Sequence, residues 1–284
     1  MPFIHVPTWR VEKYSVELVL GVAALGAQYC FESRVSEQLF LAGKTIVMWR
    51  LGKDAELSQA STGPSSASIH TMMQNVDSAG DNEHVSPIDT IRALITLMGF
   101  ATWEPKPPIV QESFALQSVL TQYTRAVLLD DVDWQGQIDQ QGNGVSLGYN
   151  WQAWIEQESS RRSRLIAFSF LHTHRIAYNV YPALRSSEVN LRLPCSTKEW
   201  KAPTALLWQA AMKETQKPQL LFKEALSLLF KNRNDSAPID PIPTPLGNYI
   251  LLHGLLQRIH IVRSLARYCG LLAHNRQAEE QQFQ

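Results

Sequence analysis

The sequence predicts an all-α fold, a multi-helix array of packed helical hairpins with long disordered loops. Three observations support this prediction. Apolar residues recur at steps of three and four positions, which is the period of one face of a helix. Prolines and glycines stand between these segments, where helices begin and end. Runs in which apolar and polar residues alternate, as in a half-buried strand, are not found.

The first predicted helices occupy the N-terminal part of the chain. Residues 11–30 place apolar side chains on one broad face, where Gly21 and Gly26 would let another helix approach closely. A second helix is predicted over residues 34–51. Residues 53–85 are then rich in serine, glycine and other small or polar residues. They bury too little apolar surface to offset the entropy of ordering, so they are predicted to form a flexible low-complexity loop.

The middle of the chain has a clear helix start. Ser86 can cap a helix end through its side chain, and Pro87 suits the first helical position because its fixed φ matches a helix. Another helix is predicted over residues 110–129, after a cluster of prolines, and a polar loop over residues 130–148. From Trp151 a long segment is predicted to be helical to about residue 178.

The C-terminal part of the chain is predicted to hold three helices. Two of them cover residues 197–213 and 219–231. A proline-rich connector over residues 233–245 leads to the last helix, over residues 246–273, where apolar residues again recur at three- and four-residue steps. The whole chain, residues 1–284, is interpreted as a single helical domain that is truncated at both ends.

Composition limits the classes of function. The chain has 26 basic and 26 acidic residues and a formal net charge of zero, so it lacks the basic surplus by which most nucleic-acid-binding domains neutralise phosphates. A local basic patch is still compatible with this composition. Cys30, Cys195 and Cys269 are far apart, which fits neither a disulfide framework nor the spacing of a zinc finger. Reduced, buried thiols in an intracellular protein are the expectation.

One apolar stretch raises the question of a membrane or export segment. Residues 18–31 contain no charged side chain, but they are fewer than the roughly 20 residues that span a bilayer. Glu12 and Glu17 precede them, whereas a signal peptide begins with a short basic segment. A buried helix is therefore expected here, with no membrane partner.

The residue patterns typical of enzymes and metal sites are weak in this sequence. His172 and His174 are two positions apart, so on a helix they point to different sides and make poor joint ligands. Asp130, Asp131 and Asp133 lack the remainder of a calcium-binding loop. The signatures of a nucleophile elbow, a metalloprotease helix, a phosphate loop and a dinucleotide fold are missing. No catalytic, cofactor-binding or metal-binding residue is assigned, and the chain is not expected to be an enzyme.

One segment is the strongest candidate for a structural or regulatory core. Trp151, Trp154, Glu158, Arg161 and Arg162 lie on neighbouring turns of a predicted helix, and Glu158 can reach both arginines. The residues could form an exposed stripe of weak ion pairs, a buried Glu–Arg pair between helices, or a basic cluster on DNA. The tryptophans favour burial, and the interleaved glutamates argue against contact with phosphate. We therefore predict a mostly buried pair beside Trp154.

Several motifs follow one another in a characteristic order along nearly the whole chain. They are Met1–Trp9 with its Pro-Thr-Trp ending, Ala24–Tyr29, the segment from Trp154 to Arg162, Leu193–Cys195, and Thr244–His253. In this order they resemble the regulatory domain of fungal transcription factors, also called the middle homology region. The Leu-Pro-Cys and Leu-Leu-His stretches are most similar to members with paired two-Cys two-His zinc fingers.

This resemblance implies a nuclear regulator of RNA polymerase II transcription that acts through coregulators or a second copy. It also implies that DNA and zinc are bound by an upstream zinc-finger module that is missing here, because Cys30 is the only cysteine among the first 194 residues. The chain itself is expected to hold no cofactor. Two alternatives remain: a helical interaction or dimerisation module without ligand sensing, and an unrecognised helical enzyme.

Overall fold

The computed structural model describes residues 1–61, 86–127, 144–180, 183–215, 217–231 and 239–282. Within these ranges the protein is helical and contains no named strand, which confirms the predicted all-α class. Its α-helices are α1 (Val16–Tyr29), α2 (Ser33–Ser61), α3 (Pro87–Trp103), α4 (Pro107–Val127), α5 (Gly144–Tyr178), α6 (Thr197–Trp200), α7 (Ala205–Glu214), α8 (Phe222–Lys231) and α9 (Pro245–Gln282).

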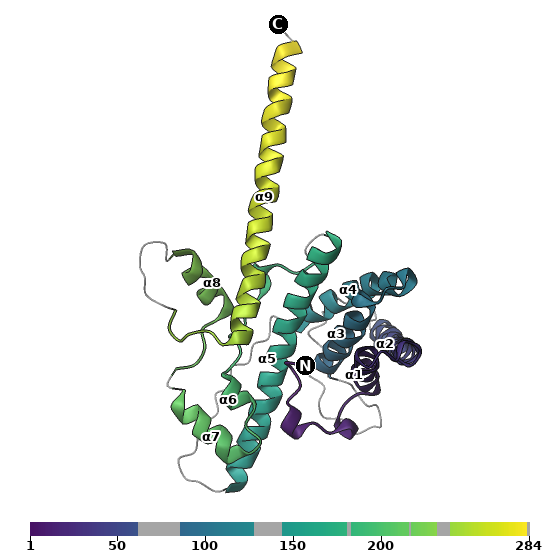
Figure 1. The fold of residues 1–284 in the computed structure, drawn as a ribbon, viewed down its shortest axis with the longest axis vertical. Helices are drawn as coiled ribbons and strands as arrows, with labels where there is room; N and C mark the ends of the chain where they lie inside the picture. The colour runs from purple at the N-terminus through teal and green to yellow at the C-terminus, as the bar shows by residue number, and fades with distance from the viewer. Residues whose placement is uncertain (62–85, 128–143, 181–182, 216, 232–238, 283–284) are drawn as a thin grey trace.

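Helices α1 to α4 form a layered group on one side of the molecule (Figure 1). Helix α3 lies at its centre, and its side chains from Thr90 to Thr102 are buried almost all the way round. Helix α1 packs closely on α3 because Gly21 has no side chain: a Cβ atom there would lie 2.1 Å from Thr96 Oγ1. Ser86 caps α3 by accepting a hydrogen bond from the Ile88 N–H, as predicted.

Helix α5 is the element that joins the two halves of the molecule. It packs against α3 and α4 on one side and against α7 and α9 on the other (Figure 1). Phe168 of α5 belongs to the main hydrophobic core, where its ring lies 5.5 Å from that of Phe222 in α8. Trp154, nearly four turns earlier on α5, belongs to a smaller cluster of tryptophans. One helix thus contributes to both cores.

Two predicted loops are shorter than expected. Helix α2 continues to Ser61, so residues 53–61, predicted as part of the flexible loop 53–85, are helical. Lysine, alanine, glutamate, leucine and glutamine make up most of these residues, and all are good helix formers. Helix α5 begins at Gly144, inside the polar loop predicted over 130–148. Residues 62–85 and 128–143, with the three clustered aspartates, lie outside the described residues.

The helix predicted over residues 197–213 is in fact two helices. Pro203 lies between them, where it has no N–H to donate, and Thr204 caps α7 by accepting a hydrogen bond from the Leu207 N–H. The short α6 begins with a capping box in which Ser196 and Glu199 bond to each other's backbone N–H.

The helix predicted over 219–231 begins only at Phe222. The residues before it are extended: Leu220 O accepts from Leu193 N at 2.9 Å, and Phe222 N donates to Leu191 O at 2.8 Å. Of the proline-rich connector 233–245, the structure describes residues 239–245, the last of which opens α9.

Helix α9 starts against α5 and α8 and then leaves the body of the protein as a single helix (Figure 1). It continues to Gln282, beyond the end predicted near residue 273. Among the described residues, no helix is both long and apolar enough to cross a bilayer.

Candidate functional site

Helix α5 holds a glutamate that is shared by two arginines. Glu158 Oε2 accepts from Arg161 Nη1 at 2.7 Å, and Glu158 Oε1 accepts from Arg162 Nε at 2.8 Å. The Glu158 side chain has no exposed surface, and both arginine side chains are at most 10% exposed. The spacings of three and four residues put all three side chains on one helical face. The buried Glu–Arg pair that the sequence predicts is therefore present, with both arginines engaged.

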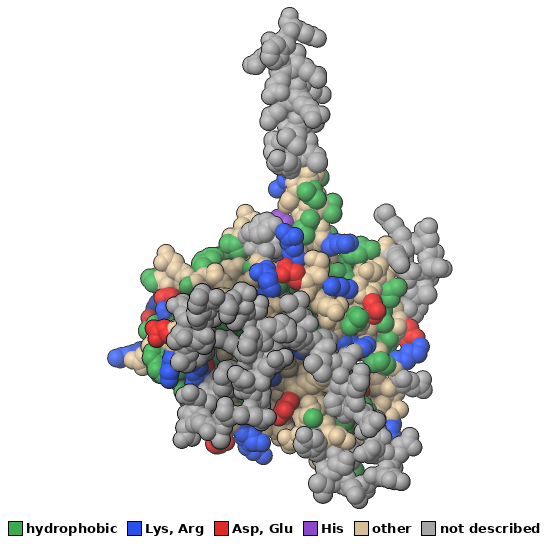
Figure 2. All heavy atoms as spheres, turned by 180° about the vertical axis from the view of Figure 1, so that it is seen from behind, with side chains coloured by type: hydrophobic (Ala, Val, Ile, Leu, Met, Phe, Trp, Pro, Cys, Tyr) green, Lys and Arg blue, Asp and Glu red, His purple; other side chains and the backbone are tan. Residues whose placement is uncertain are grey.

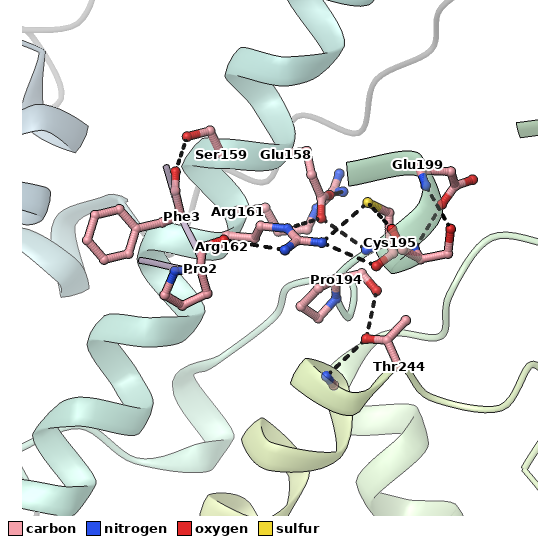
Figure 3. A network of polar contacts seen from close by, with 12 residues as sticks. Pro2, Phe3, Glu158, Ser159, Arg161, Arg162, Pro194, Cys195, Glu199 and Thr244 are labelled. Atoms are coloured by element: carbon pink, nitrogen blue, oxygen red, sulfur yellow. Dashed lines mark hydrogen bonds and ion pairs between the residues drawn. The ribbon is translucent and has the colours of Figure 1, made fainter. Parts of the chain in front are cut away.

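Arg162 extends this group to two other segments of the chain (Figure 3). Its Nη1 donates to Pro2 O at 3.3 Å, and its Nη2 donates to Cys195 O at 3.2 Å. The backbone N–H of Cys195 returns a hydrogen bond to Glu158 Oε1 at 3.0 Å. We call Glu158, Arg161, Arg162 and Cys195, with the Pro2 carbonyl, the Glu158 network. It ties the N-terminal segment and the loop before α6 to the central helix.

The electrostatics of this network explain its composition. One carboxylate faces two guanidinium groups, so the buried site has an excess of positive charge. Carbonyl oxygens of Pro2 and Cys195 accept from Arg162 and offset part of that excess. The guanidinium carbon of Arg162 also lies 4.1 Å from the centre of the Trp200 ring, whose electron-rich face favours a cation. Glu158 and Arg162 thus have several partners each, as the cost of desolvation requires. Arg161 pairs with Glu158, and its buried Nε has no hydrogen-bond partner.

The tryptophans form a cluster next to the Glu158 network. The ring centre of Trp154 lies 5.3 Å from that of Trp208 and 6.4 Å from that of Trp200. His5 joins them from the N-terminal segment, edge-on to Trp200 at 5.0 Å and to Trp151 at 6.0 Å. Burial lowers the pKa of His5, which keeps its imidazole neutral near pH 7. The cluster therefore packs His5 against α5 and α6, and packs α7 against α5.

The buried Arg92 was not identified from the sequence. Arg92 of α3 donates to Ser159 Oγ at 2.6 Å, to Ser163 Oγ at 2.9 Å and to Asp89 Oδ1 at 2.7 Å. Ser159 donates in turn to the Phe3 carbonyl at 2.6 Å (Figure 3). The available signal was a basic residue within the mostly apolar segment 87–103, three residues after Asp89, because a charge in such a segment is seldom buried unless it is paired.

His172 and His174 point to different helices, as their spacing predicts. His172 Nδ1 lies 3.0 Å from Nδ1 of His253 in α9, and His174 Nε2 lies 2.9 Å from Ser113 Oγ in α4. The pKa of each is lowered to about 4, by burial in both cases and, for His172, also by the neighbouring His253. His172 thus links α5 to α9, and His174 links α5 to α4. Among the described residues, no group of three or more potential metal ligands is found.

The polar groups of the Glu158 network are used in contacts within the protein. Burial raises the pKa of the Cys195 thiol well above its usual range, and the negative charge of Glu158 raises it further. The thiolate is the nucleophilic form, so this cysteine is held in its unreactive state. Glu158 accepts three hydrogen bonds, two from arginine side chains and one from a backbone N–H, so both of its oxygens are occupied by contacts within the protein.

Comparison with known proteins gives one partial match. Residues of this chain are 26% identical over 107 positions to zinc finger protein klf1 of Schizosaccharomyces pombe. The matched stretch is 38% of this chain but 13% of that protein, so the chain spans a small part of its relative. No protein family model matches the sequence, and no solved structure matches it. The chain is thus similar in part to a zinc finger protein.

Proposed function

We propose that this chain is the regulatory, middle homology domain of a fungal zinc-finger transcription factor, and that it modulates RNA polymerase II transcription without contacting DNA itself. The observation that supports this proposal is the partial similarity to zinc finger protein klf1, which agrees with the order of motifs along the chain. The zero net charge favours a partner other than nucleic acid. A nuclear location and coregulator partners follow from the proposal.

Within this proposal, the Glu158 network and the tryptophan cluster are the structural core of the regulatory domain. Trp151, Trp154, Glu158, Arg161 and Arg162 are buried, so they act on partners through the positions of other elements and not by direct contact. Zinc and DNA are assigned to a separate zinc-finger module, and no residue of this chain is assigned to catalysis or to a cofactor.

Tethering the chain to a foreign DNA-binding domain upstream of a reporter gene tests the proposal. The tethered chain should change reporter transcription, and the change should be lost with Glu158→Gln but kept with Glu156→Gln, because Glu156 is exposed on the same helix. The untethered chain should not shift promoter DNA at low salt. Sequence-specific, salt-sensitive DNA binding by the untethered chain would contradict the proposal.

A second candidate function, an interaction or dimerisation module without ligand sensing, is favoured by one observation. Helix α9 exposes a series of large apolar side chains where it leaves the body, among them Leu252 and Ile259. Light scattering measures self-association, and a thermal-shift screen with metabolites measures ligand sensing. A stable dimer with no thermal shift would favour the module over a ligand-sensing regulator.

A further inference from the structure

Helix α9 has an exposed stripe that combines apolar and basic side chains. Successive members are three or four residues apart, so they lie on one face of the helix. They are Tyr249, Leu252, Leu256, Ile259, Arg263 and Arg267, and all are exposed. Leu252 is 50% and Ile259 is 52% exposed. We call these six residues the α9 stripe.

The opposite face of α9 shows why the stripe is available. Ile250, His253 and Gln257 are buried against the body, where His253 meets His172 of α5 and Gln257 Nε2 donates to Leu184 O at 2.8 Å. Gly254 lets Phe222 of α8 approach closely. As far as Gln257, packing therefore occupies one side of the helix and the α9 stripe lies away from it, whereas residues 261–267 are exposed on every side.

All the charged side chains of α9 between residues 245 and 267 are positive. Residues 245–267 include Arg258, Arg263 and Arg267 and no aspartate or glutamate. Burial, and then the cations of Arg175, Arg267 and Arg263, lower the pKa of His260, which reflects the positive field along the helix. Among the described residues, neither Arg263 nor Arg267 forms an ion pair. Figure 2 shows basic and apolar side chains together where the helix leaves the body.

We propose that the α9 stripe is a docking surface for an acidic amphipathic helix of a partner protein. Apolar side chains of that helix would cover Leu252, Leu256 and Ile259, and its carboxylates would pair with Arg263 and Arg267 one and two turns further on. Helices of this kind bind through apolar residues at three- and four-residue spacing, while complementary charge sets orientation and association rate.

Other occupants fit the stripe less well. In a pairing of residues 245–267 with the same segment of a second copy, neither segment has an acidic residue to pair with the arginines. A membrane-bound amphipathic helix keeps its basic residues on the face opposite its apolar one. Here Arg263 and Arg267 continue the same line as Leu256 and Ile259. Phosphates of DNA would pair with the arginines but would leave the apolar side chains uncovered.

This inference rests on α9 alone and holds whether or not the chain regulates transcription. Fluorescence anisotropy with the full chain tests it. The probe is a synthetic helix of about 18 residues, or five turns, with leucines at three- and four-residue steps and glutamates elsewhere. A second probe has lysine in place of each glutamate. The acidic probe should bind at least about tenfold more tightly at low salt, and added salt should reduce the difference.

Two paired variants locate the binding. Leu256→Ser with Ile259→Ser, and Arg263→Glu with Arg267→Glu, should each weaken binding of the acidic probe about fivefold or more, because a few central side chains dominate such interfaces. Leu206→Ser with Leu207→Ser is the matched control. Those leucines of α7 are 71% and 55% exposed, and their loss should leave binding unchanged. All variants lie on the surface, so each should unfold at nearly the same temperature as the parent.

Three outcomes would overturn the proposal. Equal affinity for the acidic and basic probes would remove the role of charge. Binding to phosphatidylserine-containing vesicles with no binding to the acidic probe would assign the stripe to a membrane. A dimer in light scattering that Leu256→Ser and Ile259→Ser convert to monomer would assign it to a second copy. None of these results would decide whether the tethered chain changes transcription.

Discussion

Arg162 lies over the ring of Trp200, with its guanidinium carbon 4.1 Å from the ring centre. The two residues come from different helices, α5 and α6, and Arg162 Nε also donates to the buried carboxylate of Glu158. Arg162 can remain desolvated because its charge has an anion, two carbonyl oxygens and an aromatic face around it. Removal of the negative charge of Glu158 alone should therefore lower the free energy of unfolding, because the buried arginines would lose their counterion.

Glu158→Gln should lower the free energy of unfolding by about 3–5 kcal/mol, because it keeps the shape of the side chain but leaves two buried guanidinium groups without their counterion. Urea unfolding followed by tryptophan fluorescence measures the loss. Glu156→Gln is the matched control on the same helix, and its exposed side chain predicts a change within about 0.5 kcal/mol. Equal stability of the two variants would contradict a central role for the Glu158 network.

Two glycines of α1 offer a matched test of helix packing. Gly21→Ala should destabilise the protein by about 1–3 kcal/mol, because the added Cβ would lie 2.1 Å from Oγ1 and 3.0 Å from Cβ of the buried Thr96. Gly26→Ala should instead be neutral or stabilise by about 0.5–1 kcal/mol, since nothing lies within 4 Å of its added Cβ and alanine favours a helix. Thermal unfolding of the two variants gives the comparison, and effects of the same sign would refute the close packing of α1 on α3.

Most of the fold could be predicted because helical period and capping are local properties. Ser86 and Pro87 mark the start of α3 within two residues of sequence, and Glu158 finds its arginines three and four residues away on its own helix. Helix ends without such signals were misplaced, as at Ser61, where good helix formers continue α2 past the change in composition. Pro203 was present in the sequence, but its effect was missed because apolar spacing continues on both sides of it.

Contacts between distant segments could not be predicted, because no local pattern records them. The N-terminal Pro2 accepts from Arg162, 160 residues further along the chain, and the Cys195 backbone bonds to Glu158 across 37 residues. The same holds for Glu17, a fully buried carboxylate of α1 that pairs with Arg50 of α2 at 2.7 Å. These contacts depend on which helices pack together. The hydrophobic period identifies the buried face of each helix but does not identify its neighbour.

Cys30 and Cys195 should differ strongly in reactivity. In a Cys269→Ser background, Cys30 should react with iodoacetamide as an exposed thiol, whereas Cys195 should react much more slowly because burial and Glu158 raise its pKa. Each unit of raised pKa lowers the thiolate fraction about tenfold. Mass spectrometry of timed digests measures both rates. Glu158→Gln should accelerate labelling of Cys195 and leave Cys30 unchanged; equal rates at the two cysteines would show that the network is open in solution.

Stability should fall as the pH falls below about 6.5. His172 and His174 have pKa values lowered to about 4 in the folded protein, against 6.5 for an ordinary histidine. Between these values the unfolded chain takes up protons that the folded chain does not, so the stabilising contribution is complete above 6.5 and is lost as the pH approaches 4. Each such histidine contributes up to about 1.4 kcal/mol per pH unit.

Urea unfolding between about pH 7 and pH 5.5 isolates the histidines, because ordinary carboxylates stay ionised in this range. His174→Gln removes one titrating group, so it should make the dependence of stability on pH shallower by as much as about 1.4 kcal/mol per unit. Its loss of contact with Ser113 lowers stability at every pH and therefore leaves the slope as the diagnostic quantity. A slope that is flat in the parent protein, or the same in both proteins, would show that His174 is not held neutral between α4 and α5.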